Sequence, residues 1–279
     1  MRYFLLTLIP LLLSAATIKA PLLDVNDDEA TVTTETVRPG TSGYILRNFN
    51  EAFSSIISNV RVTAYDAQNK RATLKLTPYD GLEQDSLPKG KWKPQKGDTA
   101  VLAHGYNQGL LIAPSKSIYT LLTEKNPGLN WIHPDYFAAH LSLEGHPTPL
   151  IEDIQTFCSD TSTGLLYLYL VDHLFTLDCS TGALLEILPM PLERSEEKLP
   201  FYSRLQSINA DFFGEGSDEL EQYDRHYLNL IETSNPDNKA LQALLREQST
   251  AIAEATSEPE ARDISDTDAK KRTSFLDPK

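Results

Sequence analysis

Histidine and carboxylate side chains that could bind a metal are concentrated in one stretch of the sequence. They are His133, Asp135, His140, Glu144 and His146, residue types that zinc and other transition metals accept as ligands. The spacing matches neither an HExxH motif nor two histidines four positions apart, and Asp135 lies five positions from His140, a poor fit to one helix face. We therefore predict structural roles at helix ends, with Asp135 in a first helical turn, where the helix dipole favours a negative charge.

A second group of oxygen ligands surrounds two glycines. It consists of Asp211, Glu215, Asp218 and Glu219. Calcium prefers such ligands, but the spacing does not follow the EF-hand pattern, which places carboxylates at loop positions 1, 3 and 5. We favour a glycine turn followed by a helix with Ser217 as its N-cap and acidic residues in its first turn.

Motifs for covalent or cofactor chemistry are absent from the sequence. It has no G-x-S-x-G nucleophile elbow, no Walker A motif and no dinucleotide fingerprint. Cys158 stands among apolar helix positions, an environment typical of an unreactive thiol. We therefore expect a non-enzymatic protein with no metal and no cofactor.

The chain has two cysteines, Cys158 and Cys179, which are 21 positions apart. In an oxidising compartment they could form a disulfide, whose loop would stabilise the fold by about 3 kcal/mol on chain-entropy grounds. The alternative is two buried thiols that behave as small apolar side chains. The sequence leaves both possibilities open.

The charge is strongly acidic. The 279 residues include 25 basic and 39 acidic ones, a formal net charge of −14, so nothing would neutralise the phosphates of a nucleic acid, and we exclude a nucleic-acid partner. One loop is locally basic and contains Lys89, Lys91, Lys93 and Lys96 around Trp92. A solvated loop is the favoured interpretation and a binding patch is the alternative.

The N-terminal residues 1–16 have the features of a secretory signal peptide. Arg2 is followed by the mostly apolar run Phe4–Leu13, and Ser14 and Ala16 are small residues at positions −3 and −1 for cleavage after Ala16. The alternative, a membrane anchor, needs about 20 apolar residues. No later segment is long and apolar enough to span a membrane, so we predict an exported chain without a transmembrane span.

Residues 17–113 are predicted to be a β-rich domain. Short β-branched runs alternate with Gly, Pro and Asn/Asp turns, which is typical of a small barrel or sandwich. The expected strands are Thr31–Val37, Tyr44–Leu46, Ile56–Ile57, Val60–Tyr65, Ala72–Leu76, Thr99–Ala103 and Leu110–Ala113.

From residue 114 to residue 232 the pattern predicts an α/β domain. The expected helices are Ser115–Glu124 with Ser115 as N-cap, Asp135–Leu143 after Pro134, Leu150–Ser159, and one from Ser217 to about Ile231. The expected strands are Leu129–Ile132, Gly164–Val171, His173–Leu177 and Ala183–Leu188. Residues 233–279 are predicted to form a weak helix, Lys239–Ala255, and a flexible charged tail. The fold class is therefore α+β, with an N-terminal small β-barrel or sandwich, an α/β unit, C-terminal helices and a disordered tail.

The sequence ends in Phe275-Leu-Asp-Pro-Lys279. A free C-terminal lysine carries an ammonium and an α-carboxylate a few ångströms apart. A pocket with an acidic pair at one end, a basic group at the other and aromatic walls between them would bind it.

Several segments, in order along the chain, resemble one protein family. They are Pro21–Val25, Lys96–Asp98, Leu111–Pro114, Trp131–Asp135, Glu144–Pro147, Gly164–Tyr167, Leu199–Arg204 and Phe213–Glu219. Together they resemble the N-terminal domain of the plasminogen-binding surface proteins of epsilonproteobacteria, over about residues 21–232.

The resemblance implies a secreted or surface-exposed, non-enzymatic protein that captures host plasminogen. In the family, binding is attributed to lysines, in particular a C-terminal lysine that enters the lysine-binding pockets of kringle domains. Lys279 is the matching position here, and Lys270 and Lys271 are expected to assist it. The long charged extension of the best-known members corresponds to the shorter segment Lys239–Lys279.

Two hypotheses follow. In the first, the chain is an adhesin-like protein that binds plasminogen through Lys279. In the second, it is a periplasmic structural or assembly component whose folded body binds other cell-envelope proteins. Protection of the protein when intact cells are treated with protease would exclude surface display.

Overall fold

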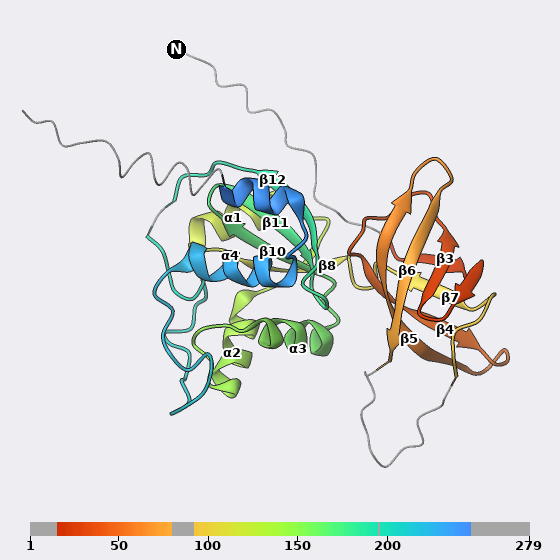
Figure 1. Cartoon of the computed structure of the whole chain (residues 1–279). Helices are drawn as coiled ribbons and strands as arrows, with labels where there is room; N and C mark the ends of the chain where they lie inside the picture. The colour runs from red at the N-terminus through yellow and green to blue at the C-terminus, as the bar shows by residue number, and fades with distance from the viewer. Residues whose placement is uncertain (1–15, 80–91, 195, 247–279) are drawn as a thin grey trace, which may run out of the picture. The chain divides into compact units, whose positions relative to one another are not determined.

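The structure is a computed structural model (Figure 1). It describes residues 16–79, 92–194 and 196–246. The chain divides into two compact units, residues 1–238 and residues 239–279. Among the described residues, the first unit contains two β-sheets and the helices α1 to α4, which confirms the predicted α+β class.

Strands β1 to β7 form an antiparallel sheet that curls into half of a barrel (Figure 1). Its spatial order is β1-β7-β4-β5-β6-β3-β2. The strands are β1 (Ile18–Pro21), β2 (Asp24–Asn26), β3 (Glu29–Thr33), β4 (Ser42–Asn48), β5 (Ser54–Asp66), β6 (Arg71–Pro78) and β7 (Thr99–Leu102). The sheet confirms the predicted β-rich, barrel-like start of the fold.

The alternation of buried and accessible side chains on β6 shows that one face of this sheet packs against a core. Ala72, Leu74 and Leu76 are buried, whereas the residues between them are not, as expected for a strand with one face on a core. The turn before β6 is stabilised by the carboxylate of Asp66, which accepts a 2.9 Å hydrogen bond from the backbone N–H of Gln68. The burial pattern of β6 and the hydrogen bond in the turn before it therefore both follow from residues that are close together in the sequence.

A second, five-stranded sheet has the order β12-β11-β10-β8-β9. Its strands are β8 (Gln108–Ile112), β9 (Asn130–Ile132), β10 (Leu165–Leu170), β11 (His173–Asp178) and β12 (Leu184–Pro189). β10 is parallel to β8 and antiparallel to β11, and β8 is parallel to β9. All six residues of β10 are buried, which fits a central strand covered on both faces. The strand predicted at Leu110–Ala113 is β8, and it pairs in this sheet.

Three helices between β8 and β10 begin and end close to the predicted positions. They are α1 (Lys116–Lys125), α2 (Pro134–Glu144) and α3 (Ile151–Thr161). Ser115 caps α1 by accepting a hydrogen bond from the backbone N–H of Ile118, as predicted. Gly145 ends α2 in the left-handed conformation at φ 75°. At the start of α3, the Asp153 carboxylate accepts a 2.8 Å hydrogen bond from the N–H of Leu150.

The predicted start of the last helix of the first unit is wrong. Helix α4 spans Tyr223–Ser234, with Gln222 as its N-cap residue, and Ser217 lies outside it. The hydroxyl of Ser217 donates to the carbonyl of Gly214, while Thr148 donates to the carbonyls of Gly216 and Asp218 through its N–H and its hydroxyl. These bonds satisfy the backbone of this segment without a helix.

In the second unit, the described residues 239–246 are helical. This confirms the beginning of the predicted helix Lys239–Ala255, and the remainder of that prediction lies outside the described residues. Among the helices of the described part of the chain, none combines the length and the apolar character that crossing a membrane requires.

Candidate functional site

The lysines proposed as partner-binding residues, Lys270, Lys271 and Lys279, lie outside the described residues. The predicted signal peptide also lies outside them, apart from Ala16. The described part of the chain therefore offers other features for a site: a disulfide with a buried carboxylate beside it, a polar cleft, a histidine-containing helix and two exposed aromatic surfaces.

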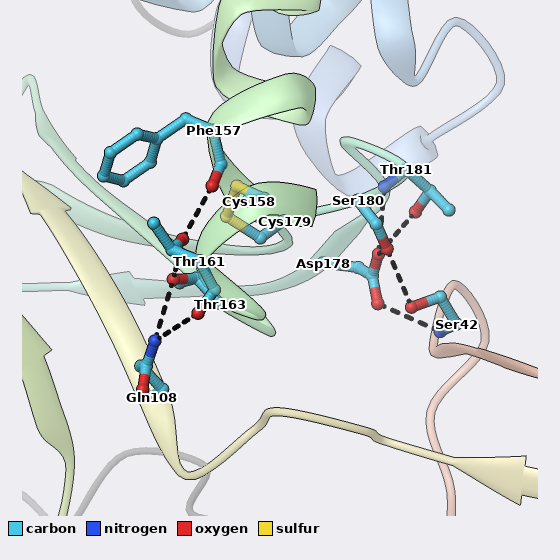
Figure 2. The surroundings of a disulfide bond; sticks show 10 residues. All are labelled: Ser42, Gln108, Phe157, Cys158, Thr161, Thr163, Asp178, Cys179, Ser180 and Thr181. Carbon is cyan, nitrogen blue, oxygen red and sulfur yellow. Dashed lines mark hydrogen bonds between the residues drawn. A yellow bond between two sulfur atoms is a disulfide. The ribbon is translucent and has the colours of Figure 1, made fainter. Parts of the chain in front are cut away.

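Cys158 and Cys179 form a disulfide in the structure (Figure 2). Cys158 lies on α3 and Cys179 directly follows β11. Their Cα atoms are 5.8 Å apart, a usual separation for bridged cysteines. Of the two possibilities that the sequence left open, the structure has the bonded pair, and the bond ties α3 to the residue that follows β11, an interior strand of the second sheet.

The carboxylate of Asp178, next to Cys179, is the most heavily hydrogen-bonded group of this region (Figure 2). One oxygen accepts from the backbone N–H of Ser42 at 3.0 Å and from the hydroxyl of Tyr106 at 2.7 Å. The other accepts from the N–H of Thr181 at 3.0 Å and from the hydroxyls of Ser180 and Thr181 at 2.9 Å each. Asp178 is 0 % exposed, so these donors replace its hydration.

The hydroxyl of Tyr106 stays protonated and so remains a hydrogen-bond donor in this network. Burial raises the pKa of its hydroxyl, and the negative charge of Asp178 raises it further. The tyrosine therefore stays protonated throughout the physiological range. The sequence contains a partial signal for the network, because Asp178-Cys-Ser-Thr-Gly182 has the residues of an Asx turn, but it does not show that Ser42 and Tyr106 meet this turn.

A cleft of about 740 Å³ lies beside the disulfide. Strands β4 and β5 contribute Tyr44 and Arg61 to its lining, and residues 155–164 contribute mainly hydroxyl and amide groups. The ring of His104 meets the ring of Tyr44 edge-on at 5.4 Å between centroids. Because Cys158 in the lining is disulfide-bonded, it is not a nucleophile. The described lining suits a polar ligand.

The side chains at the start of α2 have the structural roles that the sequence predicts. The ring nitrogen Nδ1 of His133 accepts a 3.2 Å hydrogen bond from the backbone N–H of Asp135 and so caps the helix. The Asp135 carboxylate accepts from the backbone N–H of Arg204 at 2.7 Å and from its guanidinium Nε at 2.6 Å. Burial lowers the pKa of His133, although the neighbouring Asp135 charge opposes this shift.

The other two histidines of the stretch lie elsewhere. His140 packs against the rings of Phe137 and Phe157, and its Nε2 atom is buried with no hydrogen-bond partner among the described residues. His146 makes a 2.8 Å contact with the carboxylate of Asp153. Throughout the described ranges, no three His, Cys, Asp or Glu side chains come together in a way that could hold a metal ion, and this includes the acidic stretch at 211–219.

The basic loop presents an aromatic cluster that the sequence analysis missed. The ring of Trp92 lies 4.8 Å from the ring of Phe49, which lies 5.6 Å from the ring of Phe53. Phe49 and Phe53 flank the turn between β4 and β5, and all three side chains are exposed. Lys93 and Lys96 are exposed beside Trp92, whereas Lys89 and Lys91 lie outside the described residues. In the sequence, the two phenylalanines Phe49 and Phe53 at one hairpin turn were the signal that could have predicted this cluster.

The chain is similar to one family of proteins and to two curated members with the same name. Residues 17–231 match the family described as "Plasminogen-binding protein pgbA N-terminal". The chain is 26 % identical over 179 residues to plasminogen-binding protein PgbA of Helicobacter pylori strain J99, which covers 64 % of this chain and 38 % of the relative. It is 28 % identical over 159 residues to the protein of that name from strain 26695, which covers 57 % of this chain and 34 % of the relative.

The matched part of the chain spans little more than a third of the length of these curated relatives. No solved structure matches the chain. The family match covers nearly all of the described residues of the first compact unit, from residue 17 to residue 231 within α4. The chain therefore belongs to the plasminogen-binding protein pgbA N-terminal family.

Proposed function

We propose that this chain is an exported, non-enzymatic protein that binds plasminogen. The observation that carries the proposal is the family match over residues 17–231, together with the name of the two relatives, which are plasminogen-binding proteins. The described residues of the cleft, with its disulfide-bonded Cys158, fit a binding role better than a catalytic one.

The proposed contacts are lysine side chains in the lysine-binding pockets of kringle domains. In a chain that ends at Lys279, this residue supplies an ammonium and a carboxylate together, so no loop has to be ordered to present both charges. Lys270 and Lys271 would add positive charge near it. Each of these positive charges would increase the affinity of an anionic pocket for the chain, and this increase becomes smaller as salt is added.

Export is supported by two features. Residues 1–16 have the composition of a signal peptide, and the disulfide between Cys158 and Cys179 is of a kind that persists in oxidising compartments. We place the protein at the cell surface, the location at which it would meet a host protein.

A second candidate function is favoured by the position of the family match. The match covers the folded unit and ends at residue 231, before Lys270, Lys271 and Lys279. In a periplasmic protein whose folded body binds other cell-envelope proteins, the family match would likewise cover the folded body and leave out these lysines.

Treatment of intact cells with protease separates the two candidates. Surface display predicts that the protein is cleaved while a periplasmic control protein in the same cells is retained. Complete protection of the protein, with cleavage after the outer membrane is permeabilised, would favour the periplasmic candidate. Binding of the purified chain to immobilised plasminogen, with albumin as the control surface, tests the partner directly.

A further inference from the structure

Three large apolar side chains near the end of α2 are almost fully exposed. Leu143 is 86 % exposed, Phe212 is 89 % exposed and Phe213 is 82 % exposed. The two phenylalanine rings meet edge-on, with centroids 4.5 Å apart. Single exposed apolar residues are common, but adjoining large ones mark interaction sites.

The segment that carries the phenylalanines is fixed to the end of α2 (Figure 1). The backbone N–H of Asn209 donates to the hydroxyl of Ser142 at 3.1 Å, and the N–H of Asp211 donates to the carbonyl of Gly145 at 2.9 Å. The packing is close, because a Cβ atom at Gly145 would lie 2.4 Å from Cγ of Asp211. In sequence, Leu143 lies between Ser142 and Gly145, the two positions to which the segment is anchored.

The far end of the segment is also held. Thr148 donates its N–H to the carbonyl of Gly216 at 3.1 Å and its hydroxyl to the carbonyl of Asp218 at 2.6 Å. The loop that carries Phe212 and Phe213 is therefore anchored before and after the two rings. Their exposure is a property of an anchored loop, and a partner would find the rings already in place.

The charge around the apolar centre has one sign. The acidic residues on this loop and at the end of α2 are Glu144, Asp211, Glu215, Asp218 and Glu219, and all are exposed. None of them forms a salt bridge with a described basic residue, and the sequence from residue 205 to residue 224 contains no lysine or arginine. We call the three apolar side chains and these five carboxylates the acidic aromatic patch.

We propose that the acidic aromatic patch binds a segment of another protein in which lysine or arginine side chains stand next to apolar ones. The apolar side chains of that segment would cover Leu143, Phe212 and Phe213, and its cations would pair with the surrounding carboxylates. Aromatic anchors surrounded by charges of one sign are typical of selective protein interfaces, where the charges choose the partner and speed association.

The charge also decides between occupants. An anionic lipid surface attracts basic segments and would repel this patch. A second copy of the chain would bring another acidic rim against this one, which is unfavourable between like charges. A cationic, apolar segment is the partner that satisfies both the rings and the carboxylates. This proposal does not depend on the proposed plasminogen binding, because it uses none of the lysines invoked there.

The test uses the full chain and three fluorescent octapeptides. In the first, lysines alternate with leucine and phenylalanine; in the second, serines replace the apolar residues; in the third, glutamates replace the lysines. Fluorescence anisotropy should detect binding of the first peptide, with an affinity at least about tenfold higher than that of either of the others. Equal binding of all three, or no binding of the first, would overturn the proposal.

Variants then place the binding at the patch. Phe212→Ser with Phe213→Ser should weaken binding of the first peptide about tenfold or more. Replacing Glu215, Asp218 and Glu219 by their amides should weaken it several-fold and flatten its salt dependence. The matched control is Phe53→Ser, which removes an exposed phenylalanine from the turn between β4 and β5 and should leave binding unchanged.

Unchanged binding in the double phenylalanine variant, with an unchanged melting temperature, would contradict the proposal. Sedimentation velocity provides the last check. A dimer of the unmodified chain that dissociates in the double variant would identify a second copy as the occupant, and would contradict it as well.

Discussion

The hydroxyl of Tyr106 donates a 2.7 Å hydrogen bond to the carboxylate of Asp178, and the two residues are 72 positions apart in sequence. Tyr106 lies in the turn that leads from β7 of the seven-stranded sheet to β8 of the second sheet. Asp178 ends β11 and also accepts from the N–H of Ser42, at the start of β4. One buried carboxylate thus joins segments that belong to both sheets.

Replacing Asp178 by asparagine should destabilise the protein by about 3 kcal/mol. Each carboxylate oxygen accepts one backbone N–H, from Ser42 or from Thr181, so an amide nitrogen at either position would face a donor that cannot turn away. Urea denaturation of the two proteins measures the difference. Ser42→Ala is the control: it removes only the hydroxyl contact with Ser180 and should change the unfolding free energy by less than about 1 kcal/mol.

Loss of the disulfide should also be costly. Its loop closes over the 21 positions between Cys158 and Cys179, which corresponds to about 3 kcal/mol on chain-entropy grounds. A Cys158→Ser, Cys179→Ser variant should therefore denature at a lower urea concentration than the oxidised protein. Since the chain has no other cysteine, the reducing agent should shift the unmodified chain and leave the variant unaffected. Two freely alkylated thiols in the native protein, prepared without reducing agent, would contradict the bonded pair.

His226 should make stability depend on pH. Its Nε2–H donates to the carbonyl of Pro149 at 2.8 Å, and burial lowers the pKa of the ring, although this hydrogen bond opposes the shift. The unfolded chain then binds a proton more readily than the folded chain, from about pH 6.5, the unfolded pKa, downward. The free energy of unfolding contributed by His226 is complete above that pH and falls as the pH drops toward the folded pKa.

The comparison with His226→Gln isolates this contribution. Glutamine keeps a donor for Pro149 but does not titrate, so the decrease in unfolding free energy between pH 7 and pH 5 should be smaller in the variant. The other histidine with a lowered pKa, His133, is present in both proteins and cancels. Equal pH profiles would show that His226 is as easily protonated in the folded chain as in the unfolded one.

Gly145 should tolerate no side chain. It has a left-handed φ of 75°, and a Cβ atom would lie 2.4 Å from Cγ of Asp211. Gly145→Ala is expected to lower the unfolding free energy by about 2 kcal/mol, from backbone strain and from the displaced loop. Gly128→Ala is the matched control, because a Cβ atom there meets nothing within 4 Å. Thermal melts of both variants check the contrast, and equal melting temperatures would contradict it.

The features that the sequence predicts well are set by neighbouring residues. The buried alternation on β6 and the cap of α1 by Ser115 each depend on residues within one strand or one helical turn. The incorrect start of α4 shows the limit of such signals. Ser217 is a good N-cap residue by type, but Thr148, about 70 positions earlier, binds the backbone of this segment in another conformation.

The parts of the candidate site that the sequence did not predict depend on distant pairing. The position of β8 in the second sheet follows from its pairing with β10, and local pattern does not select a partner. The donors to Asp178 come from Ser42, 136 positions away, and from Tyr106. The exposure of Phe212 and Phe213 is likewise invisible in composition, where large apolar residues are expected to be buried.

Capture of plasminogen through the C-terminal lysines is tested by measuring the affinity of residues 17–279 for purified plasminogen, with and without a lysine analogue. The matched variant carries Lys270→Gln and Lys271→Gln and lacks Lys279. We expect that the unmodified chain binds, that the analogue abolishes its binding and that the variant binds at least about tenfold more weakly. No binding by the unmodified chain, equal affinity of the two proteins without the analogue, or binding of the unmodified chain that persists with the analogue would contradict capture through these lysines.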